Sequence, residues 1–370
     1  MKLETVRTAI LHWARDQGIL SNTARPDRLE AGDKSIVPFS DEQMEYFRFR
    51  KIMRILERGG KLLTIFTRQK IADKKQVELQ QTFKKAFEKQ GFLLEIRTSR
   101  PFRIDQRLQT YGRFEPVRRN RNAICCGSSI GVGNQRNAGT FTALAKRKGK
   151  GDLYGLGCNH VIGGCSTALP GTPIVVPGIQ DVSADIAEIN LIGEFDSAAT
   201  MSQGLPSLID TSANRDIAWF GILDQKKVSS RQGTGPNAFD TPTKFATPEV
   251  DMPLKKWGRS TGFTQGIIET IHSKPEWIDY SIVSYYGPAN SQDFKGTVYF
   301  EGVIEVSSLG RPFSLGGDSG ALVVTDYPNK AGRVVGILIG GNREKSFVLP
   351  LEKTLKDLEF KLVSGHNTSP

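Results

Sequence analysis

Cysteine is scarce in this chain, and long apolar runs are missing from it. The four cysteines among 370 residues show no C-x-x-C spacing: Cys125, Cys126, Cys158 and Cys165. This favours neither a disulfide framework nor a metal site held by cysteines. The longest apolar run, 334–339, is far shorter than the ~18 residues of a membrane-spanning helix. The first residues alternate charged and apolar side chains, unlike a signal peptide. We therefore expect no membrane segment, no metal and a cytoplasmic location.

The surplus of positive over negative charge is confined to the first third of the chain. The formal net charge is +11, yet residues 121–370 hold 24 Lys and Arg against 24 Asp and Glu. Residues 1–120 hold 26 against 15. Near the same point glycine becomes frequent and short β-like segments replace helical ones. We expect a domain boundary between residues 111 and 124, and a basic amino-terminal module over residues 1–115.

The amino-terminal module reads as helical and then as mixed α/β. Apolar residues at helical spacing predict a helix over 3–17. Ser40 and Gln43 have the spacing of a capping box. The helix that they begin would end at Gly59-Gly60 and share one apolar face among Phe49, Ile52, Met53 and Leu56. Beyond it, the pattern predicts a small βαβ-like unit made of a strand at 61–68, a helix at 74–90 and a strand at 91–98.

The remaining residues read as mainly β. Short segments rich in β-branched and aromatic residues alternate with Gly and Pro turns over ~230 residues, which is typical of sandwiches or barrels. After Pro350, leucines at helical spacing predict a closing helix over 351–363.

The strongest chemical signal is GGDSGALVV at 316–324. Ser319 lies between turn-forming residues just before a strand-like segment, where a tight bend exposes its hydroxyl. The flanking glycines allow backbone N–H groups to face a developing oxyanion. The alternative interpretation is an ordinary Gly/Asp/Ser turn before a strand.

A serine nucleophile needs a base, and the chain has four histidines. His12 falls in the amino-terminal helix, His366 in the tail, and His272 in mid-strand. His160 follows a strand-like segment and begins a turn, and we favour it as the base. Four carboxylates are candidates for orienting it: Asp216 at a strand start, its rival Asp185, and the weaker Asp181 and Asp210.

The order His, Asp, Ser on a β-rich background resembles the trypsin-like serine peptidases. The segments that carry this resemblance are NHV at 159–161, DIA at 216–218 and GDSGA at 317–321. LKKWGRSTGFTQG at 254–266 is similar to the segment that opens the second barrel in intracellular and bacterial members. GILIGG at 336–341 is similar to the strand that lines their substrate cleft. The resemblance covers about residues 120–362 and favours the disulfide-free branch, since Val161 stands where secreted members have cysteine.

The resemblance implies two antiparallel six-stranded β-barrels, over 116–240 and 241–370. It also implies a serine endopeptidase without cofactor or metal, acting on protein or peptide substrates. Ser319 would attack the carbonyl, His160 would accept its proton and Asp216 would orient the imidazole. The backbone N–H groups of Gly317 and Ser319 would form the oxyanion hole. The spacing from His160 favours Asp216 over Asp185, because a barrel hairpin must fit between the two partners.

The resemblance also places a substrate pocket, with Phe313 at its base. Its walls would be Gly340, Gly341 and Ser346. An aromatic base implies a shallow apolar pocket for small or aliphatic side chains.

Asp318 departs from the pattern of the secreted members, in which the matching carboxylate pairs with a freshly cut amino terminus. Here about 120 residues precede the barrels. Either a side-chain or backbone group satisfies Asp318, or another event sets the oxyanion loop. We hypothesise that the amino-terminal module regulates or docks the peptidase.

Two other functions compete with catalysis. The first is a catalytically silent scaffold with the same fold. The second is nucleic-acid binding through residues 46–120, which hold 20 Lys and Arg against 7 Asp and Glu. An acidic protein partner would explain that surplus equally well.

Overall fold

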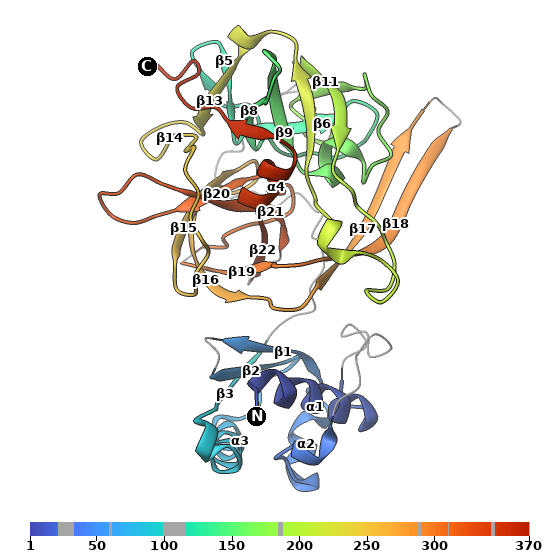
Figure 1. Cartoon of the computed structure of the whole chain (residues 1–370), viewed down its shortest axis with the longest axis vertical. Coiled ribbons are helices and arrows are strands. Elements are labelled where there is room, and N and C mark those ends of the chain that lie inside the picture. Colours follow the sequence, from blue (N-terminus) through green and yellow to red (C-terminus); the bar gives the residue numbers. More distant parts are fainter. Residues whose placement is uncertain are drawn as a thin grey trace. The chain divides into compact units, whose positions relative to one another are not determined.

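The chain divides into two compact units, residues 1–102 and 103–370 (Figure 1). The computed structural model describes residues 1–20, 33–58, 61–98, 115–183, 188–286, 290–309, 311–341 and 345–369. The expected boundary at 111–124 falls partly outside these residues and stays a prediction. None of the helices within these ranges is long and apolar enough to cross a membrane.

The amino-terminal unit is a three-stranded sheet packed with helices. Its elements are α1 (Leu3–Asp16), α2 (Asp41–Arg48), β1 (Ile52–Arg58), β2 (Leu62–Thr67), α3 (Asp73–Ala86) and β3 (Leu93–Thr98). Strand β1 runs antiparallel to β2, and β2 runs parallel to β3 with α3 as the crossover. The expected βαβ unit is therefore confirmed. The apolar faces of α1, α2 and α3 supply buried residues to one core, among them Ile10, Phe47 and Phe83.

The prediction of a long second helix is wrong. The capping box of Ser40 and Gln43 does start α2, but that helix ends at Arg48 and residues 52–58 form β1. Lys51 has φ +52°, a left-handed conformation that stops a helix. Ile52 and Ile55 lie in strand β1, which pairs with β2, and both side chains are buried. The expected stop at Gly59-Gly60 lies outside the described residues.

The second unit is mainly β, as predicted. Its first half, together with the carboxyl-terminal strand β23 (Phe360–Leu362), forms two sheets, ordered β23-β8-β9-β12-β11-β10-β6-β7 and β14-β13-β5-β4. This differs from a closed ring of six strands: β13 lies outside the larger sheet and pairs in parallel with β5. The strands are β4 (Arg119–Asn120), β5 (Ala123–Cys126), β6 (Ser129–Val132), β7 (Gly139–Thr140), β8 (Ala143–Arg147), β9 (Leu153–Gly157), β10 (Pro173–Val176), β11 (Asn190–Ala198), β12 (Ala218–Ile222), β13 (Val228–Gln232) and β14 (Phe239–Asp240).

The second half contains the expected closed six-stranded barrel, in the order β15-β16-β19-β22-β21-β20. Its interior is an apolar core that includes Leu254, Val306, Phe313 and Leu338. The strands are β15 (Pro253–Gly258), β16 (Gly262–Ile271), β19 (Ile304–Ser308), β20 (Leu322–Thr325), β21 (Val334–Gly341) and β22 (Lys345–Pro350).

A long two-stranded hairpin interrupts the barrel between β16 and β19 (Figure 1). It consists of β17 (Glu276–Tyr285) and β18 (Ser291–Phe300). The Tyr285 N–H donates to the Asn134 carbonyl at 2.8 Å, and Ser284 Oγ accepts from Gln135 Nε2 at 2.8 Å. The hairpin is thus fastened to the first half of the unit.

The closing helix is shorter than predicted. Helix α4 spans Glu352–Asp357, and the chain then forms β23 (Phe360–Leu362), which pairs with β8. Glu359 has φ +59°, which turns the chain out of the helix. Adding to the edge of β8 buries Phe360 and Leu362 while satisfying their backbone groups.

Candidate active site

Ser319 occupies a tight glycine-rich bend between β19 and β20. Gly317 has φ +92° and Gly320 has φ +98°, conformations that other residues rarely adopt. A Cβ atom on Gly320 would collide with the Thr140 carbonyl, and one on Gly317 would collide with the Arg259 guanidinium. The two glycines are therefore required both by backbone conformation and by close packing.

The Ser319 hydroxyl donates to the Ile339 carbonyl at 3.4 Å. Its backbone carbonyl accepts from the Thr140 N–H at 2.7 Å, which ties the loop to the first half of the unit. Within the described ranges no hydrogen bond joins Ser319 to the His160 imidazole. Such bonds are often long before substrate binds and tighten in the reactive complex.

His160 is held on a short π-helical turn, η5 (Asn159–Gly163), directly after β9. Its backbone N–H donates to Asp216 Oδ1 at 3.0 Å, and its Nδ1 lies 2.5 Å from Asp216 Oδ2. Both residues are buried, Asp216 almost completely. The carboxylate therefore holds the imidazole at Nδ1 and leaves Nε2 for other contacts.

A third donor reaches the same carboxylate from the β17–β18 hairpin. The Tyr280 hydroxyl donates to Asp216 Oδ2 at 3.0 Å, and its ring centroid is 5.2 Å from that of His160. Burial, and then the negative charge of Asp216, raise the pKa of Tyr280, so its hydroxyl stays protonated and remains a donor. No sequence pattern indicates this contact, because Tyr280 is one of several aromatic residues in an ordinary strand pattern.

A cleft of about 300 Å³ brings the separate segments together. His160, Gly317 and Ser319 line it from the two halves of the unit, and Ser281 and Val283 line it from β17. In the part of the chain that the structure describes, the backbone N–H groups of Gly317 and Ser319 have no acceptor. Two donors beside the serine hydroxyl are the arrangement that stabilises an oxyanion.

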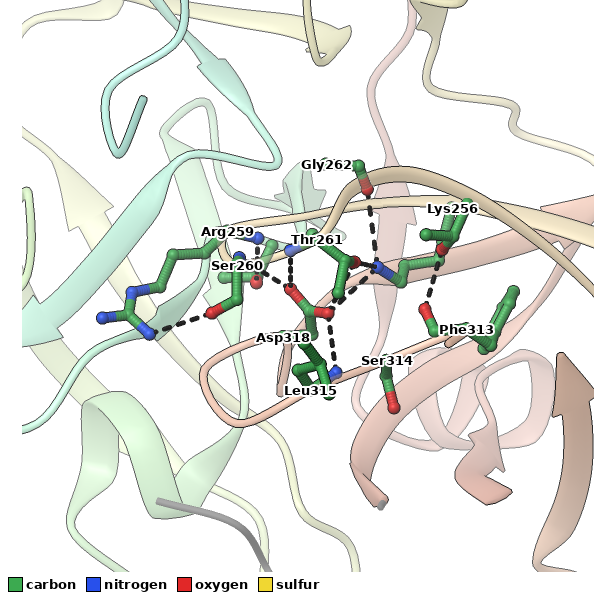
Figure 2. A network of polar contacts seen from close by, with 12 residues as sticks. Lys256, Arg259, Ser260, Thr261, Gly262, Phe313, Ser314, Leu315 and Asp318 are labelled. Atoms are coloured by element: carbon green, nitrogen blue, oxygen red, sulfur yellow. Dashed lines mark hydrogen bonds and ion pairs between the residues drawn. The ribbon is translucent and has the colours of Figure 1, made fainter. Parts of the chain in front are cut away.

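Asp318 is satisfied from within the chain, which decides between the two alternatives left by the sequence. Figure 2 shows its carboxylate surrounded by Lys256, Ser260, Thr261 and Leu315. Lys256 Nζ lies 3.2 Å from Oδ2, and both side chains are fully buried. Oδ2 also accepts from Thr261 Oγ1 at 2.7 Å and from the Leu315 N–H at 3.0 Å. Oδ1 accepts from the Ser260 N–H at 2.8 Å.

The electrostatics of this pair favour an ionised Asp318. Burial alone would raise the pKa of Asp318, but the Lys256 charge and the hydrogen bonds from Thr261, Leu315 and Ser260 hold it below its usual value. Burial lowers the pKa of Lys256 to about 8, although Asp318 opposes that shift. Near neutral pH the pair is thus an ammonium facing a carboxylate.

The other candidate carboxylates lie elsewhere. Asp181 forms a buried two-pronged ion pair with Arg259, whose Nε and Nη2 face its two oxygens. Asp210 accepts from the Ser212 N–H at 3.0 Å and caps a short turn. Asp185 lies outside the described residues. Among the described candidates, only Asp216 contacts His160.

The residues predicted to form the substrate pocket lie in and beside the closed barrel. The Phe313 ring is buried in the barrel core, against the space left by Gly266, and does not line the cleft. Its neighbour Ser314 instead faces the predicted walls: Ser314 Oγ lies 2.6 Å from Ser346 Oγ, beside Gly341. Gly340 continues β21 opposite Phe347. The backbone alternation at 313–314 turns the aromatic ring inward and the hydroxyl toward Ser346.

Solved structures of bacterial serine proteases are similar to this chain. Thermobifida fusca protease A is 17% identical, with a TM-score of 0.41 over 66% of this chain and 100% of that one. A serine protease specific for glutamic acid is 16% identical, with a TM-score of 0.38 over 65% and 100%. Cellulomonas bogoriensis chymotrypsin is 15% identical, with a TM-score of 0.36 over 65% and 98%. No family model and no curated protein matches the sequence.

One set of side chains has the composition of a metal site. Ligand atoms of Cys158, His160 and Asp216 lie within 4.8 Å of one another. However, Cys158 Sγ donates to the Leu338 carbonyl at 3.3 Å, and burial, followed by the charge of Asp216, raises the pKa of that thiol. A protonated thiol is a poor ligand. The 2.5 Å contact of His160 with Asp216 also leaves no room for an ion between them.

Proposed function

We propose that the chain is a serine endopeptidase that acts through His160, Asp216 and Ser319. The supporting observation is that three segments far apart in sequence converge. His160 and Ser319 line one cleft, and Asp216 holds His160 from behind. Within the described residues, the N–H groups of Gly317 and Ser319 have no acceptor. The substrate is a protein or peptide. We propose a cytoplasmic location and no metal or organic cofactor.

The reaction would follow from these positions. Ser319 Oγ attacks the scissile carbonyl carbon while His160 Nε2 takes the hydroxyl proton, and Asp216 stabilises the imidazolium. The carbonyl oxygen becomes an oxyanion held by the Gly317 and Ser319 N–H groups, a contribution of about 3 kcal/mol per donor. The imidazolium then protonates the leaving amine as the C–N bond breaks. Water, deprotonated by His160, hydrolyses the acyl-enzyme and releases the acid.

Lys256 would make the site competent without proteolytic processing. Its ammonium pairs with Asp318, as a freshly cut amino terminus pairs with the matching carboxylate in the secreted trypsin-like peptidases. Lys256 lies in strand β15, so no cleavage of the chain is needed to supply this charge. The oxyanion bend is therefore set by folding alone. A freshly purified, unprocessed chain is expected to be active.

A peptide library tests this function directly. We expect cleavage by the full-length chain and none by Ser319→Ala. The pocket predicted from Phe313, Gly340, Gly341 and Ser346 is shallow and apolar, so we expect cleavage after small or aliphatic side chains. Strict cleavage after Arg or Lys would contradict this pocket. Cleavage that persists in Ser319→Ala would contradict the mechanism.

The amino-terminal unit is proposed to regulate the peptidase or to dock it on a partner. It has its own core, and its surplus of Lys and Arg over residues 46–120 fits an acidic protein or a nucleic acid. Binding to arbitrary DNA or RNA that weakens steeply with salt would favour nucleic acid. No binding at low salt would favour an acidic protein.

A silent scaffold is the remaining alternative. It predicts that the chain binds a partner through the same fold yet cleaves no peptide. The retained triad residues and the satisfied Asp318 favour catalysis over this interpretation.

A further inference from the structure

The peptide between Gly316 and Gly317 has a defined direction. The Gly316 carbonyl accepts from Ser260 Oγ at 2.6 Å. Figure 2 shows Ser260 between Arg259 and Thr261. In a trans peptide the N–H points opposite to the carbonyl. Holding the Gly316 carbonyl at Ser260 therefore aims the Gly317 N–H away from Ser260. Since Gly317 lines the cleft, that N–H is available to an oxyanion there.

The Ser260 hydroxyl can serve only one acceptor, because it has one proton. Arg259 Nη1 donates to Ser260 Oγ at 3.1 Å. A guanidinium has donors and no acceptor, so it cannot receive the hydroxyl proton. The proton is therefore directed to the Gly316 carbonyl. Ser260 is almost completely buried, which removes water as a competing partner.

Arg259 is in turn fixed by Asp181, which comes from the other half of the unit. Asp181 ends the short turn η6 (Ile179–Asp181) between β10 and β11. Arg259 is 1% exposed and Asp181 is 4% exposed. Two-pronged contacts between arginine and carboxylate set orientation as well as distance. Asp181 Oδ2 also accepts from Ser129 Oγ at 2.5 Å, so the carboxylate itself is anchored in the larger sheet.

The guanidinium also packs directly on the oxyanion bend. A Cβ atom at Gly317 would overlap Arg259 Nη1, so no other residue fits there while Arg259 stays in place. On the following peptide, the Gly317 carbonyl accepts from Thr140 Oγ1 at 3.1 Å. Both peptides that flank Gly317 are thus held by hydroxyls from outside the loop.

We propose that Asp181, Arg259 and Ser260 form a chain of positioning residues that keeps the Gly317 N–H turned into the cleft. The inference deepens the proposed peptidase function and rests on it only for its kinetic consequences. None of the three residues touches the reacting atoms. Without Ser260 the Gly316 carbonyl has lost its partner, and the peptide is free to rotate and withdraw one oxyanion donor. Asp181 thereby couples the β10–β11 segment of the first half to the oxyanion bend of the second.

The test compares the full-length chain with Ser260→Ala, Asp181→Asn and their double variant. A matched control is Ser230→Ala, which removes another buried hydroxyl, one that donates to Asp240 at 2.6 Å. Complete loss of an oxyanion donor lowers kcat about 10²- to 10³-fold. In Ser260→Ala we expect only part of the molecules to have the Gly316–Gly317 peptide rotated, so kcat should fall about 10- to 100-fold. KM should stay within about twofold, because the interaction belongs to the transition state.

Asp181→Asn should lower kcat by a smaller factor in the same direction, and the double variant should be no slower than Ser260→Ala. Crystal structures of the wild type and Ser260→Ala supply a readout independent of turnover. We expect the Gly316 carbonyl to point at Ser260 in the wild type and to rotate in the variant. A carbonyl that keeps its direction in Ser260→Ala would overturn the proposal, whatever the kinetics. A raised KM with unchanged kcat would overturn it too. If the wild type cleaves nothing, the peptidase function fails while the structural comparison still decides the inference.

Discussion

Lys256 Nζ lies 3.2 Å from Asp318 Oδ2 inside the closed barrel, and neither side chain is exposed. The pair joins the barrel strand β15 to the residue directly before Ser319. A buried ion pair of this kind carries a large desolvation cost, so its members depend on each other. We therefore expect the bend that is proposed to hold the oxyanion to depend on the Lys256 charge.

Replacing Lys256 by methionine should remove activity and weaken the fold. The variant leaves the Asp318 carboxylate buried without its counter-ion, which should lower the free energy of unfolding by about 3–5 kcal/mol. Denaturant unfolding and peptide turnover measure the two effects. The matched control is Lys255→Met, whose partly exposed ion pair with Asp326 should contribute less than about 1 kcal/mol. Equal effects of the two substitutions would contradict the role assigned to Lys256.

Activity should fall above pH 8. The pKa of Lys256 is lowered to about 8, so its ammonium is lost as the pH rises through that value and Asp318 loses its counter-ion. Between pH 8 and the usual lysine value of 10.5, the unfolded chain binds more protons at this residue than the folded chain does. This group consequently adds stability as the pH rises, and the loss of activity should precede unfolding. The pH dependence of kcat/KM, with circular dichroism over the same range, checks this.

Lys256→Arg separates Lys256 from other groups that titrate in the same range. A guanidinium stays charged, so the alkaline limb should move to higher pH in this variant if it folds and turns over substrate. An unmoved limb would assign the titration to another residue.

Tyr280→Phe should slow the enzyme without unfolding it. The variant removes one donor from Asp216, which keeps both contacts to His160. A hydrogen bond to a charged group contributes about 1.5–3 kcal/mol, and transmitting about half of it to the transition state lowers kcat/KM about tenfold. Tyr154→Phe, in a buried tyrosine that packs on Phe360, is the control and should be neutral. If kcat/KM of Tyr280→Phe equals that of the wild type, the hydrogen bond from Tyr280 to Asp216 does not contribute to catalysis.

Deleting residues 1–110 should leave a folded chain that still turns over a small peptide. The second unit has its own closed barrel and core, and the site lies wholly within it. Regulation or docking by the amino-terminal unit should appear as a changed rate on a protein substrate or as lost partner binding. If rates and binding are unchanged, the amino-terminal unit does neither.

The site could be predicted where a short sequence pattern determines local structure. The glycines around Ser319 reflect left-handed backbone conformations, which few other residues adopt, and the positions of His160 and Asp216 at strand ends were visible from periodicity. Tyr280, Arg259 and Asp181 could not be assigned in the same way. Their partners lie 64 and 78 residues away for the Tyr280–Asp216 and Arg259–Asp181 contacts. Only the tertiary fold brings them together.

The errors in the fold have a similar origin. Residues 52–58 have apolar residues compatible with a helix, but pairing with β2 outweighs that local preference. The last strand, β23, falls within the helix predicted over 351–363, because Leu351, Leu355 and Leu358 have helical spacing and the local pattern does not mark the end at Glu359. Phe313 packs in the barrel core, and its role at the base of a substrate pocket stays a prediction.

Labelling with a fluorophosphonate probe tests the central claim most directly, because the probe reacts only with a serine activated by a neighbouring base. We predict one label per chain, on Ser319, in the unprocessed full-length chain. Ser319→Ala should carry none, and His160→Ala should react at least about 10³-fold more slowly. A wild-type chain that is fully folded yet takes up no label would contradict the account, as would a label on any other serine.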